Sequence, residues 1–392
     1  MPVAEQTARR ARWVLDTLGG RDVEPSGLTL RAEAWEQVER GERPQGDEVA
    51  EAFFHLARVE ERAGPRDRHG RFPVEASVLD PLDPPLERLR RALGLEPPRW
   101  RGARFAVALT HDVDTPWRWT RSGIRAAAGR LRRGAWREAS ALAAVPVHKM
   151  RGTDPNWRFE AITEAEAERD SASTFFLMAG HGHPADGAVP EAYERLRPRL
   201  VQLLSEGGSE IGLHGSYTAA ENETRLGEEK AQLESLAGPV AGQRFHYLRV
   251  DPHRNLAGLE RLGFAYDTSL GFTDAPGFRA GIAQPFRPWD AAQDRALDLI
   301  EIPLAIMDVT LGEERYLGLS AGQAETRIQS LLDWAAENGG GFALLWHTDR
   351  FDPLTARGWD RLYSRILDGV QDRGGICLTA SELAEEAAAW LQ

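Results

Sequence analysis

Apolar runs of strand length alternate with helix-like segments from about residue 105 to the end of the chain. The runs are rich in β-branched and aromatic residues, whereas several of the segments between them carry apolar residues at helical spacing. The predicted strands cover residues 105–109, 173–179, 209–215, 244–250, 264–270, 297–307, 341–347 and 375–379. Roughly eight strands that alternate with helices are typical of a parallel βα barrel or an open α/β sheet.

The first hundred residues follow a different pattern and are predicted to form a smaller α+β unit. Helical spacing is present at residues 8–18, 47–63 and 86–93. Alternation at residues 26–32 predicts a short strand, and the glycine and prolines of residues 94–100 predict a linker. We therefore expect two domains, 1–100 and 101–392. The role of the first stays open between covering the barrel, dimerisation and binding part of a substrate.

The composition narrows the class of protein and its partners. The chain has 392 residues and a net charge of −12, which argues against non-specific binding of nucleic acid. Cys377 is the only cysteine, so an internal disulfide is excluded. Residues 1–12 lack an apolar signal core, and the chain has no apolar run long enough to span a membrane. We expect a cytoplasmic protein without a membrane span. The sequence does not indicate an oligomeric state.

One segment, residues 117–144, is rich in arginine and alanine within an otherwise acidic protein. Its charge could attract an anionic substrate, such as a sugar on a phosphate-bearing carrier. The alternative is a helix whose charged face simply contacts water.

Two carboxylates stand at the end of the first predicted strand, in Asp112-Val113-Asp114. On an extended backbone, positions two residues apart point to the same side, so both side chains would face one site. Two adjacent like charges are unfavourable unless a cation or a shared proton relieves them. The pair therefore predicts either a metal-assisted site or a polar strand end in water.

Further polar residues stand at the ends of later strands. They are His214, Arg249, Asp251, Asp267 and His347. The carboxyl ends of the strands are where α/β barrels assemble their active sites. A single such residue is usually a satisfied polar side chain, but acids, histidines and an arginine from five strands together predict a site.

These residues lie in motifs that resemble those of the polysaccharide deacetylases with NodB homology. The five motifs are Thr110–Asp114, Glu210–Tyr217, His246–Arg249, Tyr266–Ser269 and Leu344–Thr348. The resemblance runs from about Phe105 to the C-terminus. It also extends to a bacterial subgroup with an extra N-terminal region. It implies a distorted parallel (β/α) barrel and a metal-dependent carbohydrate deacetylase.

The resemblance implies a role for each residue at the strand ends. Asp112 would be the general base, and Arg249 would hold and orient it. His347 would be the general acid that protonates the departing amine. Asp267 would orient one of these groups.

The resemblance also implies a divalent metal, held by Asp114 and His214. These ligands suit zinc, with cobalt and nickel as alternatives. The family has a second histidine four residues after the first, where this chain has Thr218. Water or another histidine would then have to complete the site, and the candidates are His181, His183 and His246. His111 should point away from Asp112 and support the site from behind.

The leading hypothesis is a hydrolase that removes acetyl groups from an N-acetylated sugar or glycan precursor. A barrel that has lost its metal and only binds glycans or a partner protein is the first alternative, which Thr218 would explain. The second alternative is hydrolysis of a non-sugar amide. Neither the sugar nor its linkage can be read from the sequence.

Overall fold

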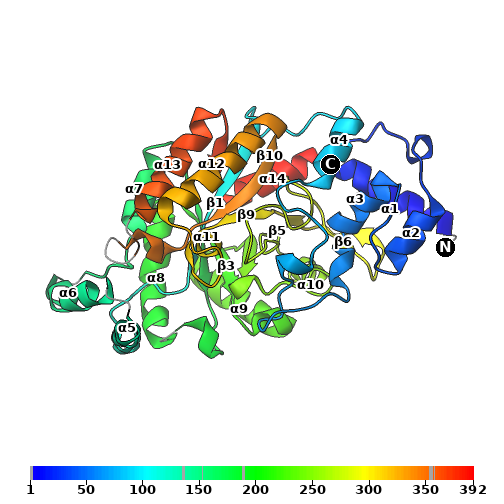
Figure 1. The fold of residues 1–392 in the computed structure, drawn as a ribbon. Coiled ribbons are helices and arrows are strands. Elements are labelled where there is room, and N and C mark those ends of the chain that lie inside the picture. The colour runs from blue at the N-terminus through cyan, green and yellow to red at the C-terminus, as the bar shows by residue number, and fades with distance from the viewer. Residues whose placement is uncertain (1–2, 135–136, 152, 188–189, 353–355, 357) are drawn as a thin grey trace.

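Parallel strands form one curled sheet at the centre of the protein (Figure 1). The computed structural model describes residues 3–134, 137–151, 153–187, 190–352, 356 and 358–392. Within them the strands are β1 (Phe105–Val113), β2 (Thr174–Met178), β3 (Glu210–Gly215), β4 (Gly242–Phe245), β5 (Tyr266–Asp267), β8 (Ile300–Glu301), β9 (Leu304–Met307), β10 (Gly340–Leu345) and β11 (Ile376–Leu378). Their order is β8-β5-β4-β3-β2-β1-β10-β9, and β11 pairs with β1. The predicted distorted parallel barrel is confirmed.

The two ends of this strand order belong to one continuous segment of the chain. β8 pairs with β5, and β9 follows after two residues and pairs with β10. The amide of Ile302 donates to the Asp267 carbonyl at 2.9 Å, and the amide of Ala343 donates to the Pro303 carbonyl at 2.8 Å. Pro303 has no N–H to donate, which explains why the single strand predicted at 297–307 is divided in two. This segment closes the barrel.

β1 is the most central strand, and every one of its residues is buried. Its first six residues pair with β10, and Thr110–Val113 pair with β2. Burial on both faces explains why its first part reads as a continuous apolar run rather than an alternating one. The strand therefore delivers Asp112 and then Asp114 to the carboxyl end of the sheet.

Helices cover the outside of the sheet. They are α7 (Phe159–Ala167), α8 (Pro190–Glu206), α9 (Glu223–Ala237), α10 (Asn255–Arg261), α11 (Asp308–Gly312), α12 (Ala321–Asn338), α13 (Trp359–Asp372) and α14 (Ala380–Trp390). The predicted capping box is present at the start of α12, where Ser320 and Gln323 cap one another. No helix among the described residues is long and apolar enough to cross a membrane.

The N-terminal region contains helices α1 (Val3–Thr17), α2 (Ala32–Glu39), α3 (Glu48–Leu56) and α4 (Pro85–Ala92). The strand predicted at 26–32 is wrong. Residues Pro25–Gly27 form a 3-10 turn, and α2 begins at Ala32. The alternating Leu28 and Leu30 pack as single side chains against the hydrophobic core, and their amides bond within the turn rather than to another strand. The α+β prediction for this region is therefore corrected to helical.

The N-terminal helices and the barrel share one hydrophobic core. Trp13 of α1 contacts Trp289 of the short β6 (Trp289–Asp290), with ring centroids 5.0 Å apart, and also contacts Phe53 of α3. β6 pairs with β7 (Arg295–Ala296) in a separate two-stranded sheet. A division of the chain at residue 100 stays a prediction, because this core crosses it.

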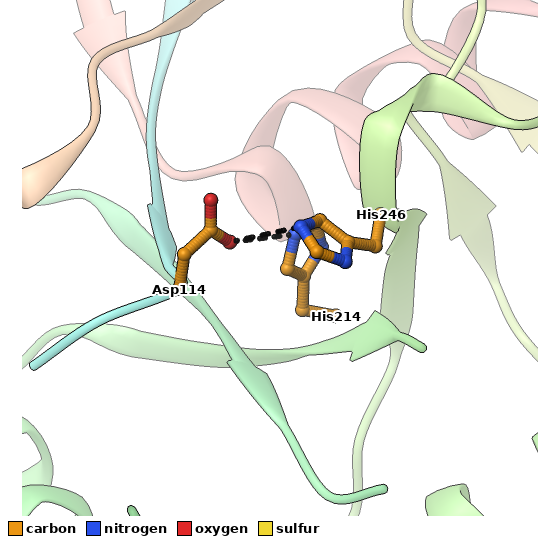
Figure 2. A group of neighbouring side chains, drawn as sticks. All are labelled: Asp114, His214 and His246. Atoms are coloured by element: carbon orange, nitrogen blue, oxygen red, sulfur yellow. Dashed lines mark ion pairs between the residues drawn. The ribbon is translucent and has the colours of Figure 1, made fainter. Parts of the chain in front are cut away.

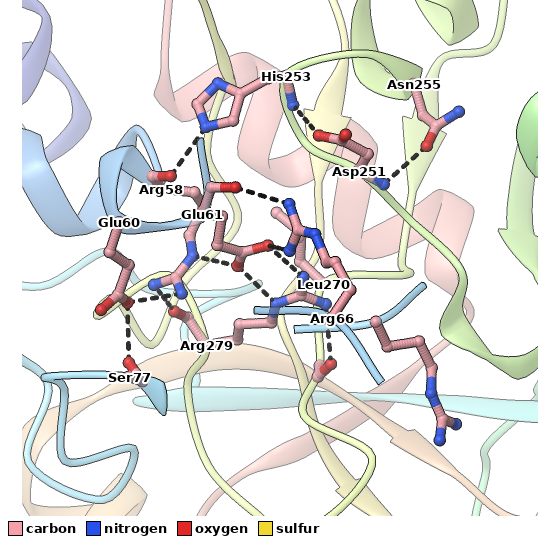
Figure 3. Close-up of polar contacts among 12 residues, drawn as sticks. Arg58, Glu60, Glu61, Arg66, Ser77, Asp251, His253, Asn255, Leu270 and Arg279 are labelled. Carbon is pink, nitrogen blue, oxygen red and sulfur yellow. Dashed lines mark hydrogen bonds and ion pairs between the residues drawn. The ribbon is translucent and has the colours of Figure 1, made fainter. Parts of the chain in front are cut away.

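A buried ion cluster also crosses this boundary (Figure 3). Glu61 accepts from Arg58 Nε at 2.8 Å, and from Arg279 Nε at 2.9 Å and Nη2 at 2.6 Å. All three side chains are almost fully buried. Burial alone would raise the pKa of Glu61, but Arg279 and Arg58 together hold it well below its usual range.

A helical hairpin stands outside the helices that cover the barrel (Figure 1). It consists of α5 (Arg121–Arg132) and α6 (Arg137–Arg151). We call residues 118–151 the α5–α6 hairpin. It follows β1 in the chain and contains most of the arginine-rich segment noted in the sequence.

Candidate active site

Three potential metal ligands converge where β1, β3 and β4 end (Figure 2). Asp114 follows β1, His214 lies in β3 and His246 follows β4. One ligand atom from each lies within 4.8 Å of the others. His214 Nε2 is 3.2 Å from Asp114 Oδ1, and His246 Nε2 is 3.7 Å from the same oxygen. The structure brings together Asp114 and His214, and of the three histidines considered for completing the site it places His246 beside them.

The contacts of each imidazole aim its Nε2 at Asp114. His214 Nδ1 donates to the Arg244 carbonyl at 2.9 Å, which leaves a lone pair on Nε2 of the neutral ring. His246 Nδ1 lies 3.1 Å from Asp186 Oδ1. Asp186 is itself held by the backbone amide of Tyr217 at 2.7 Å. Such outer contacts fix the tautomer and orientation of metal-binding histidines.

The donor set fits a divalent transition metal. The buried atoms Asp114 Oδ1 and His214 Nε2 have no hydrogen-bond partner among the described residues. Buried polar atoms without a partner are costly, and a cation between them would satisfy both. One carboxylate and two imidazoles are ligands that suit zinc. Burial opposes the charge on Asp114, yet His246 and His214 hold its pKa well below the usual range.

The position that departs from the family pattern is Thr218, whose buried hydroxyl oxygen has no hydrogen-bond partner among the described residues. Thr218 directly precedes the short 3-10 turn Ala219–Glu221. The third ligand comes from the next strand instead, through His246. The other two histidines considered for this site, His181 and His183, are not part of the ligand cluster. His183 stacks on Tyr217, and His181 packs against Tyr193. In the sequence, Arg244 and His246 stand two residues apart at the end of β4, and this spacing was the pattern that could have predicted both residues of the site.

Asp112 is buried beside the cluster and is oriented by an arginine. Arg244 Nη1 donates to Asp112 Oδ1 at 2.8 Å, and its Nε donates to the Thr268 carbonyl at 3.0 Å. The Arg244 guanidinium also lies over the Phe176 ring, 4.6 Å from its centroid. The second carboxylate oxygen, Asp112 Oδ2, is 3.6 Å from His214 Nε2. The carboxylate is therefore fixed with one oxygen toward the ligand cluster.

The predicted contact between Arg249 and Asp112 is wrong, because Arg244 makes it. β4 ends at Phe245, and the chain then turns sharply at Tyr247 and Leu248, which have φ angles of 62° and 53°. Both are left-handed conformations that cost energy in residues other than glycine. The turn carries Arg249 away from the pocket.

Arg249 instead ties two surface segments together. Its guanidinium donates to the His69 carbonyl at 2.7 Å, to the Tyr217 carbonyl and to Glu221. It also lies over the Tyr217 ring, 3.9 Å from the centroid. His69 belongs to the N-terminal region, so Arg249 fastens that region to the loop after β3.

His347 lies across from the ligand cluster and is oriented by an acid that the sequence reasoning missed. His347 Nδ1 is 2.7 Å from Asp308 Oδ1, and Asp308 also accepts from Arg350 Nε at 2.9 Å. His347 Nε2 is 3.9 Å from Asp114 Oδ2. Burial opposes a charge on the ring, but Asp308, Asp114 and Asp112 raise the pKa of His347 to about 10. Asp308 directly follows the buried β9, so the strand-end rule applied to the other strands would have found it.

Asp267 is not brought to any of these groups. It is fully buried, bonds to Gln243 and Ser269, and lies opposite Glu301 in the pairing of β5 with β8. Burial and the neighbouring Asp267 raise the pKa of Glu301 well above its usual range. The predicted orienting role for Asp267 is replaced by Arg244 and Asp308. His111, as predicted, points elsewhere and bonds to Glu166 at 2.9 Å.

A cavity of about 300 Å³ opens onto Asp112, Asp114, His246 and His347. One wall comes from the N-terminal region through Arg71. Arg71 Nε donates to Asp67 at 2.8 Å, and its Nη2 donates to the Tyr316 hydroxyl at 3.2 Å. Other polar residues of the wall are Glu313, Arg315, Asp349 and Arg350. The N-terminal region thus covers part of the barrel mouth.

No protein-family model and no curated protein matches the chain. Among solved structures, it is similar to a protein assigned as a polysaccharide deacetylase from Mycobacterium smegmatis, at 20% identity and a TM-score of 0.48, over 74% of this chain and 91% of the other. A protein with the same assignment from Pseudomonas aeruginosa PAO1 has 16% identity and a TM-score of 0.49, over 74% and 94%.

A third solved structure, a protein assigned as a glycoside hydrolase/deacetylase from Parabacteroides distasonis, has 14% identity and a TM-score of 0.45, over 72% of this chain and 71% of the other. Identities of this size do not carry an activity from one protein to another, because one fold hosts many functions. The chain is similar to solved polysaccharide deacetylases, and its function has to be argued from the site.

Proposed function

We propose that the protein is a metal-dependent hydrolase that removes the acetyl group from an N-acetylated sugar. The observation that carries the proposal is the position of the ligand cluster. Asp114, His214 and His246 face one another between an arginine-held Asp112 and an aspartate-held His347, and all of these residues except His214 line one cavity. The acetyl group and the sugar come from the motif resemblance.

Asp114, His214 and His246 would hold the metal, and zinc fits them best. When bound, it would polarise the scissile carbonyl and lower the pKa of a water molecule. Asp112 is the proposed general base, since Arg244 fixes one of its oxygens and leaves the other turned toward the cluster. His347 is the proposed general acid, because Asp308 holds Nδ1 and leaves Nε2 facing the cavity.

The size of the cavity favours a small substrate unit. Ligand pockets usually span about 300 to 1,000 Å³, and this one lies at the lower end of that range. The polar walls suit a hydroxyl-rich ligand. One sugar unit of a glycan or of a glycan precursor would enter, with the rest of the molecule outside.

The first experiment measures the metal content of the purified protein after incubation with zinc or cobalt. We expect about one metal ion per chain, which His246→Gln and Asp114→Ala each lose. His183→Gln is the matched control, since His183 lies outside the cluster, and it should keep the metal. Equal metal content in His246→Gln and the wild type would overturn the ligand set. A wild type without metal would overturn the hydrolase and favour the glycan-binding barrel.

The second experiment measures acetate release from a panel of N-acetylated sugars and small amides. We expect Asp112→Asn to retain its metal while acetate release falls by about a hundredfold or more. Turnover equal to that of the wild type would exclude Asp112 as the base. Cleavage of non-sugar amides alone, without acetate release from any sugar, would replace the sugar deacetylase with an amidohydrolase.

A further inference from the structure

The α5–α6 hairpin carries a charge opposite to that of the rest of the protein. Residues 118–151 contain nine lysines and arginines and one acidic residue, Glu138. The remainder of the chain contains 39 basic and 59 acidic residues. The hairpin therefore has an excess of positive charge, whereas the rest of the chain has an excess of negative charge. It creates a positive field on one projecting element of an acidic protein.

The hairpin contributes little to the core of the barrel. Trp119, Ala127 and Ala141 form a small hydrophobic cluster of their own, with Ile124, Leu142 and Val145 packed around it. No member of this cluster belongs to the larger clusters inside the barrel. The apolar residues of the hairpin therefore do not fill the hydrophobic core of the barrel.

Several cations of the hairpin are exposed and have no acidic partner among the residues that the structure describes. Arg125, Arg132, Arg133, Lys149 and Arg151 are exposed. None of these five makes an ion pair with a residue that the structure describes. By contrast, Arg365 and Arg373 of α13 pair with Glu325 and Asp333 of the neighbouring α12. Opposite charges thus face each other between α12 and α13, whereas the sequence of the hairpin offers a single acidic residue for its nine cations.

Exposed apolar side chains accompany the cations on α6. Met150 is 79% exposed and Val147 is 42% exposed, and Met150 stands between Lys149 and Arg151 in the chain. Cations beside exposed apolar side chains are typical of helices that lie on an anionic membrane, where the apolar groups enter the headgroup boundary. Cations that only contact the phosphates of a nucleic acid need no such apolar partners.

The hairpin begins at the same end of the barrel as the candidate active site. Asp114 lines the cavity, and Arg118 follows four residues later. Arg118 Nη1 contacts Asp352 Oδ2 at 2.5 Å, in the segment after β10. The carboxylate of Asp154 accepts the amides of Arg118 and Trp119 at 2.8 Å each, which closes the base of the hairpin. The base of the hairpin therefore lies at the same end of the barrel as the cavity.

We infer that the α5–α6 hairpin docks the protein on an anionic phospholipid surface. Phosphate-bearing headgroups would meet the arginines, and Val147 and Met150 would enter the headgroup boundary. This inference does not depend on the proposed hydrolysis, because it concerns a different set of residues.

Co-sedimentation of the full chain with vesicles tests the inference. The probes are vesicles with about 30% phosphatidylglycerol in phosphatidylcholine, and vesicles of phosphatidylcholine alone. We expect binding to the anionic vesicles at low salt, a large loss of binding at about 0.5 M salt, and little binding to the neutral vesicles. Absence of binding to anionic vesicles at low salt would overturn the inference, as would equal binding to both.

Two triple variants separate the hairpin from net charge. Arg125→Gln/Arg132→Gln/Arg133→Gln should weaken vesicle binding by roughly a hundredfold. The control Arg88→Gln/Arg261→Gln/Arg365→Gln removes the same charge from exposed arginines that have acidic partners, and should change binding less than about twofold. Equal losses in both variants would overturn the assignment to the hairpin.

A third variant and a second probe test the kind of partner. Val147→Ser/Met150→Ser keeps every charge and should still weaken vesicle binding by about tenfold. If this variant binds the vesicles as tightly as the wild type does, Val147 and Met150 do not take part in docking. A short single-stranded oligonucleotide that binds the hairpin more tightly than the anionic vesicles do would replace the lipid surface with a nucleic acid.

Discussion

Two regions have been added to the barrel, and they are attached in different ways. The N-terminal region shares a hydrophobic core with the barrel through Trp13 and Trp289 and a buried ion cluster through Glu61. It also supplies Arg71 to the wall of the cavity. The α5–α6 hairpin has its own small core and several exposed cations that have no acidic partner in the part of the chain that the structure describes.

The N-terminal region is therefore part of the fold of the barrel, whereas the α5–α6 hairpin is an appendage to it. The charges of the Glu61 cluster are buried and compensated, so they act within the molecule. Five cations of the hairpin, Arg125, Arg132, Arg133, Lys149 and Arg151, are exposed, so they are available to a partner outside the molecule. If this interpretation is correct, damage to the first region should cost stability and damage to the second should cost interactions only.

The largest expected effect is the loss of Glu61. Glu61→Ala leaves Arg58 and Arg279 buried without their shared acid, which should lower the free energy of unfolding by about 3–5 kcal/mol. Urea denaturation of the variant and the wild type measures this. Glu325→Ala, which breaks an exposed pair with Arg365, is the control and should cost less than about 1 kcal/mol. Similar small losses in both would show that the cluster does not fasten the two regions.

The same residue predicts a dependence of stability on pH. Arg279 and Arg58 hold the pKa of Glu61 below its usual 4.5, against the effect of burial. The stabilising contribution is therefore complete above pH 4.5 and is lost as the pH falls below it, by at most about 1.4 kcal/mol per pH unit. Unfolding free energies between about pH 6 and about pH 3 measure the slope. Glu61→Gln should show a shallower slope, and an unchanged slope would contradict the assignment.

Arg71 tests whether the N-terminal region takes part in substrate binding. Once the acetate screen has identified a substrate, Arg71→Ala should lower kcat/KM by about tenfold, mainly through a higher KM. The metal content should not change, because Arg71 is not a ligand. Arg68→Ala, an exposed neighbour, is the control and should leave both constants near the wild type. Equal effects of the two substitutions would mean that the segment acts only through its fold.

The smallest expected effect is the removal of the hairpin. A short Gly/Ser linker between Thr120 and Thr153 keeps the base that Asp154 closes. The free energy of unfolding should change by less than about 1 kcal/mol, since no barrel core residue is lost. Calorimetry and denaturation measure this. A loss of several kcal/mol would make the hairpin part of the fold and break the comparison.

Much of the site could be predicted because one rule locates it. Polar residues directly after buried strands lie at the carboxyl end of a parallel sheet, and this placed Asp112, Asp114, His214 and His347 correctly. The same rule led to Arg249 only because β4 was taken to be five residues too long. With the strand ending at Phe245, Arg244 and His246 are its polar residues, and both reach the site.

Other features depend on contacts between distant segments, which no local pattern encodes. The position of Arg71 against Tyr316 joins residues 245 apart in the chain. The alternation at residues 26–32 was read as a strand, because the same spacing serves a sheet face or single side chains packing on a core. Only the absence of a partner strand decides between them.

The central position of β1 in the sheet also means that this strand is synthesised long before β10, with which it pairs. Its apolar residues pair with β10, whose first residue, Gly340, lies more than 220 positions later in the chain. At about 5–20 residues per second, a ribosome needs roughly 10–45 s to cover that distance. During this interval an apolar strand is out of the ribosome without its main neighbour. The newly made chain is therefore expected to need protection by chaperones until its last quarter appears.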